Sequence, residues 1–214
     1  MSCYAGSMPC DEPRDQHTAE VAQPTAGNNG VVTELIVVAG PPGAGKSTVA
    51  RVLADGFARS ALVVGDDFFA FVRQGYIDPW LDEATQQNDV VIRAAAAATG
   101  RLVTGGYQVV YDGVIGPWFA QTFLAAAGLE EMQYAVLLPS LDCCLARVTD
   151  RTGHGFTDLA ATEQVHRQFA GAGIAERHLF TDDSDDAATT AARVRARIGE
   201  GSLVYRRPAA RPAG

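Results

Sequence analysis

The segment from Gly40 to Thr48 reads GPPGAGKST and constrains the fold of this chain more than any other feature. A glycine is followed by four residues and then by Gly-Lys-Ser, which is the spacing of a phosphate-binding loop. A continuous apolar run, Leu35 to Ala39, comes directly before it, as expected for a strand that is buried on both faces of a parallel sheet. Such a loop opens a helix, so we predict a helix from Lys46 to about Arg59.

The loop also predicts how a nucleotide is bound. Glycines adopt positive φ and let backbone N–H groups surround phosphate oxygens, and the helix N-terminus adds a positive partial charge. We expect Lys46 to act in catalysis at the β- and γ-phosphates, and Ser47 to bind Mg²⁺. The expected cofactors are ATP and Mg²⁺, although GTP also fits such a loop. The expected nucleotide-binding residues are Gly40, Pro41, Pro42, Gly43, Ala44, Gly45, Lys46, Ser47 and Thr48.

Strand and helix patterns alternate along the rest of the chain. Short apolar runs predict four more strands, at residues 61–64, 109–111, 135–138 and 178–181. Helical patterns separate them, at residues 82–104, 118–127, 141–150 and 160–170, and a last helix starts near Ser184. We therefore predict a doubly wound α/β fold with a mainly parallel five-stranded sheet of the P-loop NTPase type, similar to nucleoside and shikimate kinases. Ligands bind such sheets at the carboxyl ends of the strands.

Composition sets the limits of this domain and the class of partner. Residues 1–31 are polar and lack apolar periodicity, and residues 205–214 are rich in Pro, Ala and Arg, so we expect a flexible leader and tail around a domain at 32–204. A net charge of −8 argues against nucleic acid and anionic membranes as partners. There is no apolar run of membrane-spanning length and no signal peptide, and the cysteines do not suggest a disulfide scaffold. We expect a cytoplasmic monomer or homodimer.

Carboxylates follow two of the predicted strands. Asp66 and Asp67 come after the strand at 61–64, where a kinase needs an acid to accept or orient the proton of an acceptor hydroxyl. We favour Asp67 as the catalytic base and Asp66 as an acceptor-binding residue, although the pair could instead cap the next helix. Asp112 ends the apolar run at 109–111, and we predict that it binds Mg²⁺ through water or orients the acceptor.

Aromatic side chains gather at the same end of the predicted sheet. Phe68 and Phe69 follow the second strand and Trp118 follows the third, so we expect them to line an acceptor pocket. Arginines are scarce there, with only Arg73 and Arg93 nearby, whereas a nucleoside monophosphate kinase needs guanidinium groups to hold the acceptor's phosphate. A neutral or amine-bearing acceptor is therefore favoured.

A lid is predicted at about residues 150–160. Arg147 and Arg151 are four residues apart on one helix face, and Thr-Gly-His-Gly, which contains His154, breaks the helix after them. Lid arginines supply positive charge to the leaving phosphates and exclude water, so we expect both to be catalytic. The segment from Asp112 to Gly116 misses the switch spacing of GTPases, and their N-K-x-D motif is absent.

These motifs together resemble the small P-loop phosphotransferases related to chloramphenicol phosphotransferase, and are also similar to gluconate kinase and zeta toxins. The resemblance covers about residues 33–198. It implies transfer of the γ-phosphate of ATP to a hydroxyl of a small molecule, for example an antibiotic or secondary metabolite. In chloramphenicol phosphotransferase an aspartate after the second strand is the proposed base, which corresponds by position to Asp67. Two alternatives are a zeta-toxin-like kinase of an activated sugar and an ATP-dependent protein that sequesters a partner without phosphorylating it.

Overall fold

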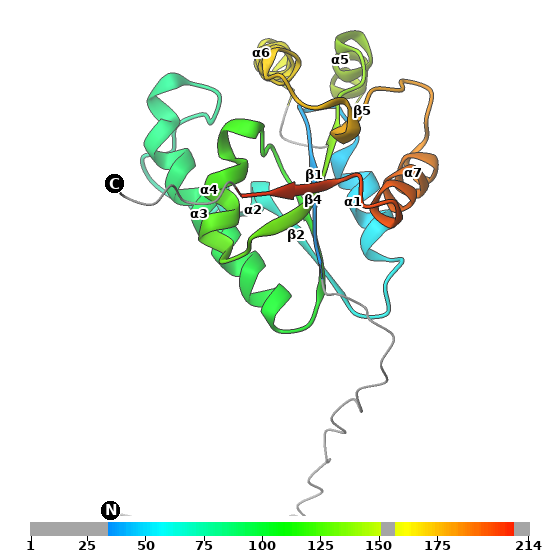
Figure 1. Ribbon diagram of the computed structural model, residues 1–214. Coiled ribbons are helices and arrows are strands. Elements are labelled where there is room, and N and C mark those ends of the chain that lie inside the picture. The colour runs from blue at the N-terminus through cyan, green and yellow to red at the C-terminus, as the bar shows by residue number, and fades with distance from the viewer. Residues whose placement is uncertain (1–33, 151–156, 208–214) are drawn as a thin grey trace, which may run out of the picture. The chain divides into compact units, whose positions relative to one another are not determined.

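A twisted sheet forms the centre of the domain (Figure 1). The computed structural model describes residues 34–150 and 157–207. Strand β1 (Leu35–Ala39) lies in the middle of the sheet, and all of its residues are buried. The order β2-β3-β1-β4-β5 is parallel throughout, as predicted, and the other four strands are β2 (Ser60–Val64), β3 (Gln108–Asp112), β4 (Glu131–Leu137) and β5 (Leu179–Phe180).

A sixth strand that the sequence analysis did not predict completes the sheet. Strand β6 (Val204–Arg206) runs antiparallel to the start of β4, with Val204 opposite Gln133 and Arg206 opposite Glu131. Residues 205–207, assigned to the tail from the sequence, therefore continue the folded domain. The rest of that predicted tail, and the predicted leader, lie outside the described residues.

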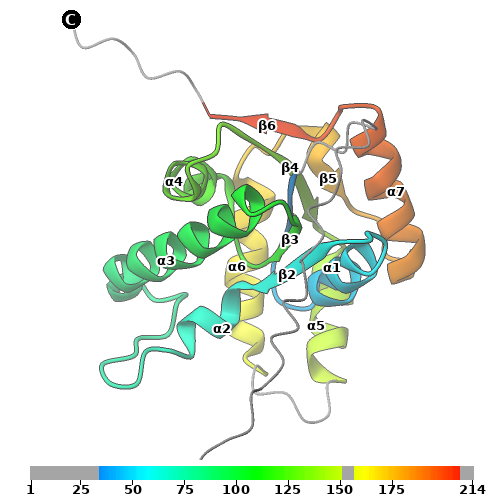
Figure 2. The ribbon, with the colours of Figure 1, turned by 90° about the horizontal axis from the view of Figure 1, so that it is seen from below.

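Helices cover both faces of the sheet (Figures 1 and 2). Helices α3 (Thr85–Thr104) and α4 (Pro117–Ala127) pack on one face, and α1 (Lys46–Ala54) and α7 (Ala187–Gly199) pack on the other. The alternation of β1 explains this arrangement, because Val37 joins the core under α3 and α4 while Val38 joins the core under α1 and α7. The predicted doubly wound α/β fold is thus confirmed.

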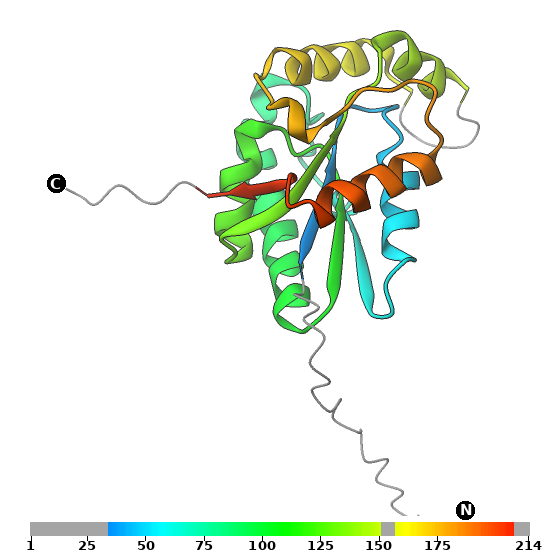
Figure 3. The same ribbon diagram turned by 45° about the vertical axis from the view of Figure 1, so that its right-hand side comes forward.

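The carboxyl ends of the strands carry the remaining helices. Helices α5 (Leu141–Thr149) and α6 (Leu159–Gly171) lie across this end of the sheet (Figure 3), and the short α2 (Gly65–Phe69) follows β2 directly. Two 3₁₀ turns, Asp82–Ala84 and Glu176–His178, precede α3 and β5. The predicted lid residues Arg151 and His154 lie outside the described residues. In the part of the chain that is described, no helix combines the length and apolar character needed to cross a membrane.

His178 links the last two strands to the core. Its Nδ1 lies 2.9 Å from the carbonyl oxygen of Tyr134, and since a carbonyl oxygen only accepts, Nδ1 carries the hydrogen. The ring is buried next to the rings of Tyr134 and Tyr205, the latter on β6. Its Nε2 has no hydrogen-bond partner among the described residues. Burial lowers the pKa of His178, more than the hydrogen bond to Tyr134 raises it.

This histidine predicts a loss of stability in mild acid. The neutral form is favoured in the folded state, so the unfolded chain binds the extra proton as the pH falls below about 6.5, and the free energy of unfolding falls with it. Urea unfolding between pH 7.5 and 5.5 should show this decline in the wild type and a shallower one in His178→Phe. His166→Gln is the control and should keep the wild-type slope; an undiminished slope in His178→Phe would contradict the assignment.

Candidate functional site

The phosphate loop connects β1 to α1 at the carboxyl end of the sheet. Three of its glycines have positive φ: 145° at Gly40, 79° at Gly43 and 93° at Gly45, which is the left-handed residue before α1. These values let the chain curl before the helix starts, so the first N–H groups of α1 point into the loop. Lys46 Nζ donates a hydrogen bond of 3.0 Å to the carbonyl oxygen of Pro41, within the same loop.

Two of these glycines also touch neighbouring backbone. A Cβ atom on Gly40 would collide with the carbonyl oxygen of Leu137 at the end of β4, and one on Gly43 would collide with the carbonyl oxygen of Cys144 in α5. Cys144 is itself buried, and burial raises the pKa of its thiol to about 11. Both glycines are therefore required by space as well as by backbone conformation.

Asp112 lies beside the start of α1. It ends β3, is 4% exposed, and its carboxylate is hydrogen-bonded to the side chain of Ser47. Burial raises the pKa of Asp112, while Lys46 and the Ser47 hydrogen bond act in the opposite direction, and the charge of Asp66 raises it again. The structure thus brings together Lys46, Ser47, Asp112 and Asp66, four of the residues that the sequence singled out.

The two acidic residues after β2 are not equivalent. Both are exposed in α2, but Asp66 is the one whose charge acts on Asp112 and Tyr111. Its charge also acts on Tyr76, whose pKa is raised mainly by burial and next by Asp78. Asp67 follows one helical position later and so leaves α2 in another direction. Of the two, Asp66 is therefore the one whose charge reaches Asp112.

Aromatic residues of the acceptor side contact the core under α3 and α4. Phe68 packs against that core, with its ring 5.4 Å from the ring of Phe71. Phe69 is half-buried. Trp118 is 44% exposed and meets the buried ring of Phe169 on α6 edge-on, at 5.2 Å between centroids. Trp118 therefore stands at the junction of α4 and α6 and leaves a large part of its ring open.

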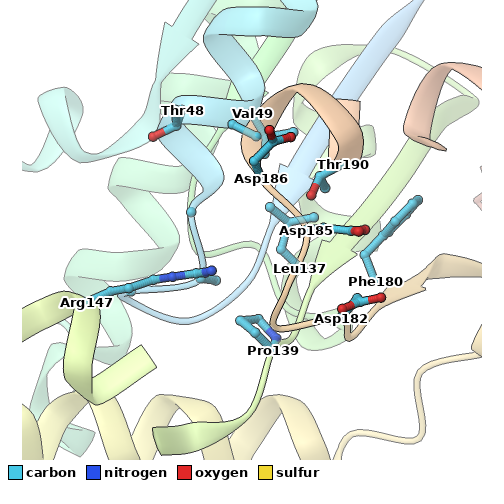
Figure 4. A pocket seen from close by; sticks show the side chains of 14 residues that line it. Thr48, Val49, Leu137, Pro139, Arg147, Phe180, Asp182, Asp185, Asp186 and Thr190 are labelled. Atoms are coloured by element: carbon cyan, nitrogen blue, oxygen red, sulfur yellow. The ribbon is translucent and has the colours of Figure 1, made fainter. Parts of the chain in front are cut away.

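Arg147 reaches from α5 towards the phosphate loop (Figure 4). A guanidinium nitrogen lies 3.7 Å from the position of a Cβ on Gly45, and another donates to the carbonyl oxygen of Asp183 at 3.5 Å. The Asp183 carboxylate in turn accepts hydrogen bonds of 2.7 and 2.6 Å from the backbone and hydroxyl of Ser140, and these bonds lower its pKa. Ser140 caps α5, so this chain of contacts holds the helix that carries Arg147.

A pocket of about 340 Å³ extends from the loop between Arg147 and the segment before α7 (Figure 4). Its walls combine apolar and acidic side chains, which include Val49, Leu137, Pro139, Phe180, Asp182, Asp185 and Asp186. The sequence analysis missed this pocket, because the acidic run before the last helix was read only as a helix start. Asp186 does cap α7, but Asp182 and Asp185 pair with Arg193.

The oxygen atoms around Ser47 and Asp112 suit Mg²⁺. Among the described residues, no group of three or more His, Cys, Asp or Glu side chains could hold a metal ion by itself. Mg²⁺ usually keeps several waters and takes one or two protein oxygens together with substrate phosphates. The hydroxyl of Ser47 and the buried carboxylate of Asp112 fit that requirement.

Comparisons with known proteins concern the family and the fold of this chain. A family model described as an AAA domain matches residues 35–172. A search of curated protein sequences finds no relative. Among solved structures, the tunicamycin resistance protein of Deinococcus radiodurans is similar, with a TM-score of 0.60 at 18% identity over 78% of this chain and 96% of that one.

Two kinases have the same fold. A sugar kinase from Janibacter sp. HTCC2649 has a TM-score of 0.60 at 18% identity, over 78% of this chain and 95% of that one. A gluconokinase from Sinorhizobium meliloti 1021 has a TM-score of 0.53 at 18% identity, over 80% of this chain and 94% of that one. This chain therefore has the fold of small P-loop kinases, as the resemblance seen in its motifs implies.

Gly43 provides a test of how the loop is packed. Gly43→Ala combines a strained positive φ with a collision against Cys144, whereas Gly173, with φ 63° and no atom within 4 Å of a Cβ, offers the strain alone. We expect Gly173→Ala to lower the free energy of unfolding by about 1 kcal/mol. Gly43→Ala should cost at least about 3 kcal/mol, in the range of core disruptions, as measured by urea unfolding. Equal losses in the two variants would contradict the close approach of loop and α5.

Proposed function

This chain belongs to the AAA domain family, and from that premise we propose that it is a kinase that transfers the γ-phosphate of ATP to a hydroxyl of a small molecule. The observation that carries the proposal is the buried Asp112 at the phosphate loop, which is hydrogen-bonded to Ser47 and feels the charges of Lys46 and Asp66. Phosphoryl transfer requires a loop that binds phosphates, oxygen ligands for Mg²⁺ and an accessible carboxylate.

ATP would lie along the loop and the adjoining pocket. The glycines and the first N–H groups of α1 bind the β- and γ-phosphates, and the ammonium of Lys46 adds a positive charge. Ser47 and Asp112 would hold Mg²⁺, which neutralises charge on the phosphate oxygens when bound. The apolar walls Val49, Leu137 and Phe180 suit the flat face of a nucleobase.

The acceptor side supports general base catalysis by Asp66. Its carboxylate is exposed and therefore reachable by an acceptor, and its charge acts on Asp112. We choose it over Asp67, which the sequence favoured, and leave Asp67 at the rim of α2. Arg147 next to Gly45 would stabilise the charge that develops on the transferred phosphate, and Arg151 follows it in the chain.

The acceptor is, on this proposal, a neutral or amine-bearing hydroxyl compound with an apolar part. Acidic residues dominate the segment around α2, and the half-open ring of Trp118 together with Phe68 and Phe69 offers apolar contacts. An antibiotic or secondary metabolite meets this description. The protein would work in the cytoplasm, as a monomer or homodimer. A kinase of an activated sugar would need more basic residues for the acceptor's diphosphate, and a sequestering protein would not need the exposed Asp66.

Two measurements test the function. ATP with Mg²⁺ should raise the thermal midpoint of the wild type through binding to the folded state, and Lys46→Ala should weaken this shift. Incubation with γ-labelled ATP and a library that contains tunicamycin, chloramphenicol, gluconate and amino sugars should place the label in a small molecule. If a library compound strengthens ATP binding but no label is transferred, the result would favour the sequestering protein. If ATP does not change the thermal midpoint of the wild type, the nucleotide site itself is overturned.

The choice between the two carboxylates has its own test. Asp66→Asn removes the base and should lower the rate of phosphoryl transfer about 10²–10⁴-fold while the ATP-dependent thermal shift is kept. Asp67→Asn is the matched control, one residue away with the same change of charge, and should stay within about threefold of the wild type. If instead the loss follows Asp67→Asn, the base is Asp67.

A further inference from the structure

Tyr111 is a buried residue that the proposed reaction leaves without a task. It precedes Asp112 on β3, and because strand side chains alternate, its ring enters the core under α3 and α4 while Asp112 faces α1. Its exposed fraction is 2%. The neighbouring strand β2 places Val63 opposite Tyr111 and Val64 opposite Asp112, so that Gly65 and Asp66 come directly after.

Two glycines make room for the Tyr111 ring. A Cβ on Gly65 would collide with its hydroxyl oxygen, and a Cβ on Gly113 would lie 2.6 Å from a ring carbon and 3.2 Å from the hydroxyl oxygen. Phe123 meets the ring edge-on, at 4.6 Å between centroids. The hydroxyl group therefore lies between Gly65, at the start of the helix α2 that bears Asp66, and Gly113, which follows Asp112.

The hydroxyl of Tyr111 can donate a hydrogen bond and has no partner of its own among the described residues. A tyrosine hydroxyl is an ordinary hydrogen-bond donor at neutral pH. No residue in the described part of the chain makes a hydrogen bond with the hydroxyl. A phenylalanine would fill the same space, so packing alone does not explain a hydroxyl group at this point.

We propose that the Tyr111 hydroxyl donates a hydrogen bond to the attacking oxygen of the acceptor, and thereby orients it between Asp66 and the γ-phosphate. This inference rests on the proposed kinase function and adds a catalytic residue to its site. An attacking oxygen has one proton to give to Asp66 and two lone pairs. One lone pair forms the new bond and the other accepts from Tyr111, so three directions fix the oxygen.

The transfer balances with Tyr111 unchanged. The acceptor oxygen forms a bond to the γ-phosphorus, and the bond between that phosphorus and the bridging oxygen breaks, its electron pair leaving with ADP. The acceptor's proton passes to the Asp66 carboxylate. Tyr111 keeps its own proton, because it only donates a hydrogen bond.

Hydrolysis of Mg·ATP tests this role, with water as the probe nucleophile and ADP release as the readout. Tyr111→Phe should lower kcat about 10-fold, the effect of one lost hydrogen bond in the transition state, at an unchanged KM for ATP and an unchanged thermal midpoint. A merely structural role would instead lower the thermal midpoint or change KM together with kcat.

Two control variants complete the experiment. Tyr76→Phe removes the other phenol near Asp66, and Tyr107→Phe removes a phenol before β3 whose ring lies 4.3 Å from the guanidinium of Arg59. Both should keep the wild-type kcat. Wild-type kcat in Tyr111→Phe, or a loss found only in Tyr76→Phe, would overturn the role of Tyr111 and leave the proposed function standing. A wild type that neither binds nor hydrolyses ATP would overturn the proposed function and this role with it.

Discussion

The close approach of the phosphate loop to two carbonyl oxygens is the constraint on which the rest of the site depends. Gly40 meets the last residue of β4, and Gly43 meets α5, the helix that follows β4. Because β4 is the direct neighbour of β1, these contacts fasten the loop to the adjacent strand and to α5. They also set the distance between the loop and Arg147 on α5, the helix whose start is held by Ser140 and Asp183. The packing of these two glycines against backbone therefore determines the position of the Arg147 guanidinium relative to the loop.

Strand register determines the electrostatics of the same site. Val38 lies opposite Asp112, so the carboxylate that ends β3 emerges on the face where α1 begins. A buried carboxylate is costly unless it is paired, and here Lys46 and the hydroxyl of Ser47 provide the compensation. Tyr111 precedes Asp112 on β3, so its side chain enters the opposite face because side chains alternate along a strand. One register therefore sends the carboxylate towards the phosphate loop and the phenol into the core on the opposite face.

Most of the features next to the phosphate loop could be predicted from the sequence, and fewer of the features that depend on tertiary packing. The buried strand at Leu35 to Ala39, the helix start at Lys46 and the position of Asp112 follow from local patterns, and the structure contains all three. The sequence does not tell the directions of the Asp66 and Asp67 side chains apart, because these directions depend on how α2 leaves β2. Strand β6 was missed because three residues before a Pro- and Arg-rich end carry no periodicity, and its pairing with β4 is a long-range contact. Tyr111 looked like one more apolar residue of a strand.

Lysine and arginine occupy different kinds of position in this protein, lysine an enclosed one and arginines open ones. Lys46 is the only lysine among 17 basic residues, and its ammonium is folded against the loop carbonyl of Pro41 at 3.0 Å. An ammonium is a compact charge, whereas a guanidinium is a planar fork that needs several acceptors and more space. Arginines occupy positions where that space exists. Arg195 donates a hydrogen bond to the carbonyl oxygen of Val52 in α1, and Arg197 lies over the ring of Phe180. Arg147 lies next to Gly45 of the loop. The contacts of Gly40 and Gly43 already close the loop on two sides, so an arginine at position 46 would have to open it. The same glycine contacts that hold the loop in place therefore favour lysine at this position.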